Sequence, residues 1–159
     1  MAKVLDNVDK GILNELQENG RSSIVDLAER VHLTKTPCSE RVKRLEREGF
    51  VRKYSAVLDP DMVQRGQVTL VQVSLSKTSE NALPEFNRAV KKLPEVQGCY
   101  LIAGNFDYLL KVRTRDISHF RDVFEDKISK LPSVMQTHSF AVMETVKEST
   151  HIDMFGVDM

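Results

Sequence analysis

The spacing of apolar residues changes once along this chain, and that change limits the folds open to it. From Val8 to Glu48 the apolar side chains recur every three or four residues, which is the period of an amphipathic helix. After Gly49 they alternate with polar side chains, which is the period of a strand. The sequence therefore predicts a helical N-terminal unit followed by a unit that contains a sheet.

Three short helices are predicted before Gly49. The first ends at Asn19-Gly20, and the second begins after Ser22-Ser23. The third begins at Pro37, with Thr36 as its N-cap. A tight link between the second and third helices is typical of a helix-turn-helix. Residues 50–58 then alternate in the manner of a short hairpin, or wing.

The second half predicts the order strand, helix, strand, strand, helix, strand, which is a ferredoxin-like unit. The expected elements are strand 68–76, helix 82–93, strands 96–102 and 108–113, helix 117–131 and strand 134–146. The fold class is thus α+β, a winged helix-turn-helix followed by a ferredoxin-like βαββαβ domain. The expected boundaries are 1–60 for the first domain, 61–67 for a linker, 68–148 for the second domain and 149–159 for a frayed or partner-swapped tail.

Charge is balanced over the chain but not along it. There are 23 basic and 23 acidic residues, yet the stretch from Lys35 to Lys53 holds seven basic residues against three acidic ones. With Cys38, Val42 and Leu45 turned inward, the opposite side of the third helix becomes polar and basic. The residues expected to contact DNA are Thr36, Ser39, Glu40, Lys43, Arg44 and Arg47, with Arg52 and Lys53 on phosphates. The alternative is the solvated charged face of an ordinary amphipathic helix.

Other classes of protein find little support in the sequence. The apolar runs are too short for a membrane helix, and no signal-peptide core follows Met1, so a cytoplasmic protein without a membrane partner is expected. The four histidines and two cysteines show no metal-ligand spacing. No phosphate-binding glycine loop or nucleophile elbow is present. We therefore expect no enzyme activity, no cofactor and no metal site.

The stretch from Ala103 to Tyr108 has two interpretations. Gly104-Asn105 suits the tight turn of a hairpin. Free amides at such a turn can also accept a carboxylate, while Asp107 can pair with an ammonium group. Those two groups together describe a free α-amino acid.

Several motifs resemble those of one protein family. They are Ile12-Leu13-Asn14-Glu15-Leu16, Arg41-Val42-Lys43-Arg44-Leu45-Glu46-Arg47, Gly104-Asn105-Phe106-Asp107-Tyr108 and Phe140-Ala141-Val142-Met143-Glu144. Over nearly its whole length the chain resembles the Lrp/AsnC (feast/famine) transcription regulators, and most closely the leucine-responsive branch. The resemblance implies a regulator that binds double-stranded DNA and responds to an amino acid. It also implies homodimers that pair through their C-terminal sheets and assemble further into tetramers or octamers.

The resemblance also suggests where the effector binds. By matching to the family, the effector residues are Leu101, Gly104, Asn105, Asp107 and Tyr108, with Met135, Gln136, Thr137 and His138 from a later loop. Many family members have Asp at the position of Asn105, so the charge beside the ligand differs in this chain. Two alternatives stay open, namely an effector-independent architectural protein that wraps DNA and a dimeric α+β barrel enzyme.

Overall fold

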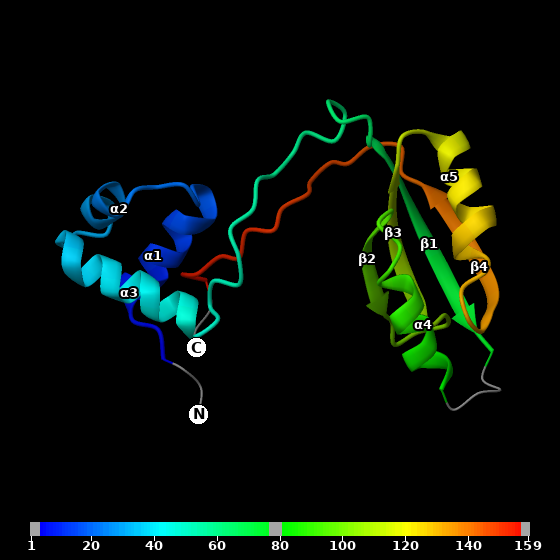
Figure 1. Ribbon diagram of the computed structural model, residues 1–159, viewed down its shortest axis with the longest axis horizontal. Helices are drawn as coiled ribbons and strands as arrows, with labels where there is room; N and C mark the ends of the chain where they lie inside the picture. Colours follow the sequence, from blue (N-terminus) through cyan, green and yellow to red (C-terminus); the bar gives the residue numbers. More distant parts are fainter. Residues whose placement is uncertain (1–3, 77–80, 157–159) are drawn as a thin grey trace. The chain divides into compact units, whose positions relative to one another are not determined.

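The computed structural model describes residues 4–76 and 81–156. It contains two compact units (Figure 1). The first spans Met1–Val57 together with Lys147–Met159, and the second spans Leu58–Val146. The chain therefore passes between the two units twice.

The first unit is built from three helices, as the sequence predicts. They are α1 (Asn7–Glu18), α2 (Ile24–Arg30) and α3 (Lys35–Arg47). Asp6 caps α1, and Ser23 caps α2 by accepting from the amide of Asp26. The helices enclose a core made of Leu5, Ile12, Leu13, Leu27, Ala28, Cys38, Val42 and Leu45. The predicted inward face of α3 is thereby confirmed.

The start of α3 differs from the prediction. Its N-cap is Thr34, so the expected cap at Thr36 is wrong. Thr36 and Pro37 both lie inside the first turn, where amide groups have no partner within the helix. A proline there removes no hydrogen bond, so the helix can begin two residues earlier than its proline suggests.

Residues 50–58 contain no strand, so the expected hairpin is wrong. Phe50 and Val51 pack instead against the core of the helices. The hydroxyl of Tyr54 donates to Glu46 Oε1 at 2.8 Å, and its ring lies against Gly20, where an added Cβ would stand 3.2 Å from it. The first part of the alternating pattern thus makes contacts with the helices, whereas Val57 and Leu58 at its end stay exposed.

The C-terminal segment differs from the expected free tail. Lys147–Met159 groups with the helical unit, and Met154 packs against the core of that unit. Residues 157–159 of the predicted tail lie outside the described structure. Nothing in the spacing of residues 147–156 points to this packing, because the segment forms neither a helix nor a strand.

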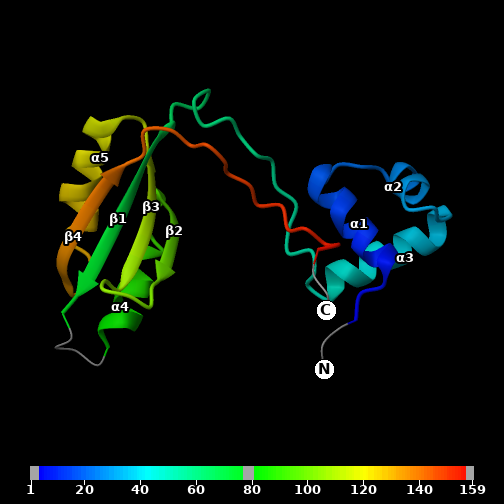
Figure 2. The ribbon, with the colours of Figure 1, turned by 180° about the vertical axis from the view of Figure 1, so that it is seen from behind.

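The second unit has the predicted βαββαβ order. Its elements are β1 (Gln67–Leu75), α4 (Ala82–Val90), β2 (Val96–Leu101), β3 (Tyr108–Thr114), α5 (Ile117–Val123) and β4 (Val134–Ala141). The strands form one antiparallel sheet in the order β2-β3-β1-β4 (Figure 1; Figure 2). This strand order confirms the ferredoxin-like fold. A π-helical turn, Phe124–Ile128, continues α5 within the helix expected over 117–131.

Both helices of this unit cover the same face of the sheet. Phe86 of α4 and Phe120 of α5 pack into one core with alternate residues of the two central strands. The intervening residues, such as Leu70 and Leu109, point to the other face, which neither α4 nor α5 covers. Strand β4 ends at Ala141, short of the predicted Val146. Its partner β1 begins at Gln67, so the chain beyond residue 142 has no strand to pair with.

Candidate functional site

The outer side of α3 carries a stripe of polar residues. Thr36, Glu40, Lys43 and Arg47 are all exposed and follow one another at spacings of four, three and four. Those spacings place all four side chains on one face of a helix. Ser39 lies beside them and is half-buried. Five of the six residues predicted to contact DNA from α3 thus lie on or next to one face.

Arg44 is placed differently. Its Nη2 contacts Asp9 Oδ2, while Arg41 Nη1 lies 2.8 Å from Asp9 Oδ1 and 2.6 Å from Asp6 Oδ2. Asp9 is only 1% exposed. Two of the seven basic residues counted between Lys35 and Lys53 are therefore held by carboxylates of the first helix.

The turn before α3 depends on a left-handed backbone conformation at His32, where the sequence predicts only that the second helix ends nearby. His32 has a φ of 55°, in the left-handed region. Its amide donates to Glu29 O at 3.2 Å, and the amide of Leu33 donates to Ala28 O at 2.8 Å. This pair of bonds is a Schellman motif, which ends α2 and turns the chain toward α3. Glycine is the usual signal for such a turn, so a histidine gives no warning of it.

The segment after α3 keeps two cations on the surface. Gly49 ends the helix with a φ of 83°, as the sequence predicts. Arg52 and Lys53 are exposed, and they lie between the packed Val51 and the anchored Tyr54. Burial and the hydrogen bond to Glu46 together raise the pKa of Tyr54 to about 12. The phenol therefore stays neutral and keeps its bond at ordinary pH.

The turn between β2 and β3 is tied into the end of the sheet through Asp107. Its Oδ2 accepts from the amide of Leu75 at 2.7 Å, and its own amide donates to Val73 O at 3.0 Å. The amide of Ile102 donates to Asp107 O at 2.8 Å, which closes the turn. Asp107 therefore has a structural role in addition to the predicted one.

The two segments predicted to bind an effector lie at the same end of the sheet. Val73 of β1 pairs with Tyr108 on one side and with Thr137 on the other. Adjacent strands are ~4.8 Å apart, so β3 and β4 are separated by about 10 Å across β1. The predicted residues that are exposed here are Leu101, Gly104, Asn105, Met135, Gln136 and His138.

The side chain of Tyr108, a predicted effector residue, does not face the turn between β2 and β3. Its side chain is 2% exposed and points into the core, with its ring centroid 4.5 Å from that of Phe86. Burial raises the pKa of its phenol. Only the backbone of Tyr108 lies beside the turn, so its hydroxyl is not presented to a ligand there.

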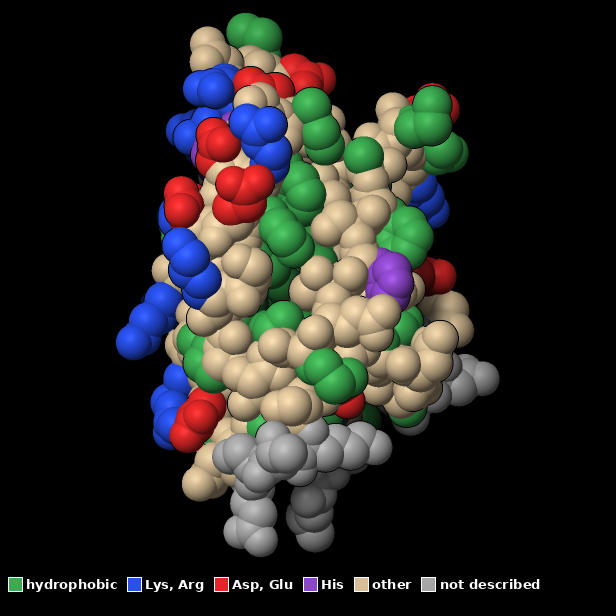
Figure 3. All heavy atoms as spheres, turned by 90° about the vertical axis from the view of Figure 1, so that its right-hand side faces the viewer, with side chains coloured by type: hydrophobic (Ala, Val, Ile, Leu, Met, Phe, Trp, Pro, Cys, Tyr) green, Lys and Arg blue, Asp and Glu red, His purple; other side chains and the backbone are tan. Residues whose placement is uncertain are grey.

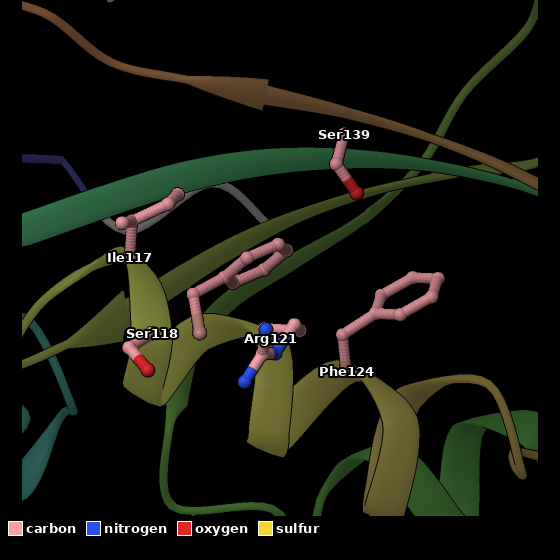
Figure 4. Close-up of a pocket in the computed structure, with 6 residues that line it drawn as sticks. Ile117, Ser118, Arg121, Phe124 and Ser139 are labelled. Carbon is pink, nitrogen blue, oxygen red and sulfur yellow. The ribbon is translucent and has the colours of Figure 1, made fainter.

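A separate hollow of about 470 Å³ lies between α5 and β4. Apolar side chains gather along the middle of this face of the second unit (Figure 3). The hollow is lined by Ile117, Ser118, Phe120, Arg121, Phe124 and Ser139, and the ring of Phe124 and the side chain of Ser139 border it from opposite sides (Figure 4). None of these residues belongs to the predicted effector set, although Ser139 follows His138 in β4.

Residues 4–76 and 81–156 contain neither a candidate metal site nor a membrane-spanning helix. No group of three or more His, Cys, Asp or Glu side chains converges there in a way that would hold a metal ion. No helix in the same ranges is long and apolar enough to cross a bilayer.

Two family models match this chain. The winged helix-turn-helix DNA-binding model covers residues 5–52, and the Lrp/AsnC ligand binding domain covers residues 68–152. Together they account for both compact units.

Individual relatives match along almost their whole length. The proline dehydrogenase transcriptional activator of Rhizobium radiobacter is 51% identical over 145 residues, which cover 91% of this chain and 93% of the relative. The leucine-responsive regulatory protein of Escherichia coli K12 is 45% identical over 150 residues, covering 94% and 92%. A crystal structure of a transcriptional regulator in complex with L-Met, from Neisseria meningitidis, superposes with a TM-score of 0.92 at 37% identity, covering 96% and 99%.

Proposed function

This chain belongs to the Lrp/AsnC family of DNA-binding transcription regulators, and on that premise we propose how its residues perform the two parts of that function. The observation that carries the first part is the exposed stripe of Thr36, Glu40, Lys43 and Arg47 on α3. A helix of this kind enters the major groove with its N-terminal residues against base edges. Thr36 and Ser39 lie in the first turns of α3 and are assigned to bases.

The basic residues are assigned to the DNA backbone. Lys43 and Arg47 follow on the same face, and Arg52 and Lys53 extend the exposed cations beyond the helix. Phosphate contacts fix the register of a protein on the duplex. Arg44 is not assigned a DNA contact, because its guanidinium already contacts Asp9. Double-stranded DNA is the expected partner.

The second part of the function is a response to an amino acid. The turn at Gly104 and Asn105 is exposed and suits the effector's carboxylate. Asp107 uses Oδ2 on the amide of Leu75, which leaves Oδ1 for an ammonium group. On the other side of β1, the exposed residues Met135, Gln136 and His138 of β4 are assigned to the effector's side chain. Thr137 pairs with the core residue Val73 and therefore shares the sheet face of Tyr108. The L-Met complex of the Neisseria relative supports an amino acid as ligand.

The uncovered face of the sheet is assigned to self-association. Leu70 pairs with Phe140, and Leu109 pairs with Tyr100, so these four side chains lie together on that face. Tyr100 is 56% exposed and Phe140 is 51% exposed. Apolar surface of this kind is stabilised by burial against a second copy, and a twofold dimer is the commonest arrangement. We propose a homodimer that assembles further into a tetramer or octamer, working in the cytoplasm by binding and not by catalysis.

The experiment that tests this function measures the thermal stability and the mass of the purified protein with each of the twenty amino acids. A ligand at a hundredfold excess over its dissociation constant stabilises the native state by ~2.7 kcal/mol. We expect a shift with one chemical class, leucine and methionine being the first to try, together with a change in mass by light scattering. If no amino acid shifts the stability or mass while duplex DNA still binds, the effector part is overturned in favour of an architectural protein. Turnover of a substrate by the protein would instead support the barrel enzyme.

A further inference from the structure

A buried carboxylate links the first helix to the DNA-binding helix. Asp9 is 1% exposed and accepts a bond from Arg41 Nη1 at 2.8 Å, while its other oxygen contacts Arg44. That second oxygen also accepts from the amide of Asp6 at 3.3 Å. One carboxylate therefore holds two arginines of α3 and closes the capping box of α1.

The two arginines are only partly covered by this arrangement. Their side chains are 32% and 35% exposed, and each uses a single terminal nitrogen on Asp9. Arg44 lies four residues after Glu40 and three before Arg47, so it borders the exposed stripe, ~40–60° around the helix from these two residues. A guanidinium released from Asp9 has the length and flexibility to reach a phosphate beside that stripe.

Charge near the stripe matters because the affinity for DNA of any sequence increases with every phosphate that the protein neutralises. By sequence, residues 35–53 carry an excess of four positive charges. Counting Asp6 and Asp9, which contact the same arginines, lowers that local excess to two.

We propose that Asp9 is a specificity-determining residue, which keeps Arg41 and Arg44 bound within the protein and away from the phosphates of non-cognate DNA. The proposal rests on the assignment of α3 to DNA. Asp9 acts through the arginines and has no contact with DNA itself. A purely structural role for Asp9 predicts a different result, namely weaker binding to all DNA as the fold loosens.

The test uses the full chain and a duplex of arbitrary sequence, with affinity measured over a range of salt concentrations. Asp9→Asn keeps the shape of the side chain but removes its charge. We expect the slope of log affinity against log salt to steepen by about 1, because Arg44 is released while Arg41 keeps its contact with Asp6, and each added phosphate contact contributes ~0.9. Glu29→Gln is the matched control, since it removes one negative charge from an exposed position on α2. A steeper slope in Asp9→Asn alone supports the proposal, whereas equal slopes in the two variants overturn it.

A second pair of variants keeps the proposal testable if Asp9→Asn fails to fold. Arg44→Gln is expected to leave the slope at the value of the unchanged protein, while Lys43→Gln lowers it by about 1. An equal loss in both variants would show that Arg44 already contacts phosphate, which overturns the proposal. The Lys43→Gln variant separates this result from the assignment of α3, because an unchanged slope in that variant would mean that the exposed stripe does not contact phosphate.

Discussion

Gln17 and Ile152 are 135 residues apart in the sequence and form two hydrogen bonds. Gln17 Nε2 donates to Ile152 O at 2.9 Å, and the amide of Ile152 donates to Gln17 Oε1 at 2.7 Å. A primary amide has a donor and an acceptor on separate atoms, so it can pair with the N–H and the C=O of one backbone residue at the same time. With Met154 packed on the same core, the pair makes the C-terminal segment a part of the helix-turn-helix unit.

Replacement of Gln17 by alanine should release this segment. Each exposed hydrogen bond contributes ~0.5–1.5 kcal/mol, so we expect a loss of about 1 kcal/mol in the free energy of unfolding. We also expect faster hydrogen exchange at the amide of Ile152, measured by NMR. Asn14→Ala is the control, because Asn14 bonds only locally, to Glu18 in the next turn of α1. Equal exchange at Ile152 in both variants would contradict the prediction.

Replacement of His32 by glycine should stabilise the helical unit. A side chain in the left-handed region costs ~1–2 kcal/mol, and glycine removes that cost while adding entropy to the unfolded chain. We expect a net gain of about 0.5–1 kcal/mol, measured by chemical denaturation. Glu29→Gly, inside α2, should instead cost about 1 kcal/mol. A loss of stability in His32→Gly would show that the imidazole makes a stronger contribution than its backbone strain.

The comparison of Gly49 with His32 explains what the sequence can predict about this fold. Both residues have a positive φ, but only glycine is a known signal for it. The end of α3 was therefore predictable, and the turn that sets its start was not. Helices and strands were predicted correctly because their periods depend on which face is buried. The hairpin at 50–58 was wrong because only Phe50 and Val51 pack on the helical core, while Val57 and Leu58 are exposed and make no strand.

The sequence likewise predicts part of the candidate site but not all of its contacts. The stripe from Thr36 to Arg47 follows from helical geometry once Cys38, Val42 and Leu45 are buried. The contact between Arg44 and Asp9 joins residues 35 positions apart, and no local pattern encodes it. Tyr108 was placed in the effector set by the family resemblance, but strand alternation sends its side chain into the core.

Acid should weaken the N-terminal cap of α1 through Asp6. The amide of Asp9 donates to the Asp6 carboxylate, and together with Arg41 it lowers the pKa of Asp6 in spite of partial burial. Because the pKa of Asp6 is lower in the native state than in the unfolded chain, where it is ~4, the Asp6 carboxylate stabilises the fold at pH values above ~4. This contribution is lost as the pH falls through the pKa that Asp6 has in the native state. We expect the melting temperature of Asp6→Asn to fall less than that of the unchanged protein between pH 5 and about pH 3.

The Asp6→Asn variant should keep most of its stability at neutral pH, because asparagine is as good an N-cap as aspartate. Glu18→Gln, at the other end of α1, is the matched control for loss of one carboxylate. The prediction is contradicted if the three proteins lose stability in parallel as the pH is lowered.

Arg47 offers the most direct test of the face of α3 assigned to DNA. It is exposed at the end of the stripe, and none of the ion pairs within the described residues includes it. Its guanidinium is therefore available to a phosphate, and Arg47→Ala should weaken binding by a similar factor across different DNA sequences. The slope of log affinity against log salt should fall by about 1. Lys91→Ala, an exposed cation at the end of α4 in the other unit, removes the same charge and should leave the slope unchanged. If the two variants change the slope equally, binding responds to the net charge of the protein, and the stripe on α3 is not the surface that contacts DNA.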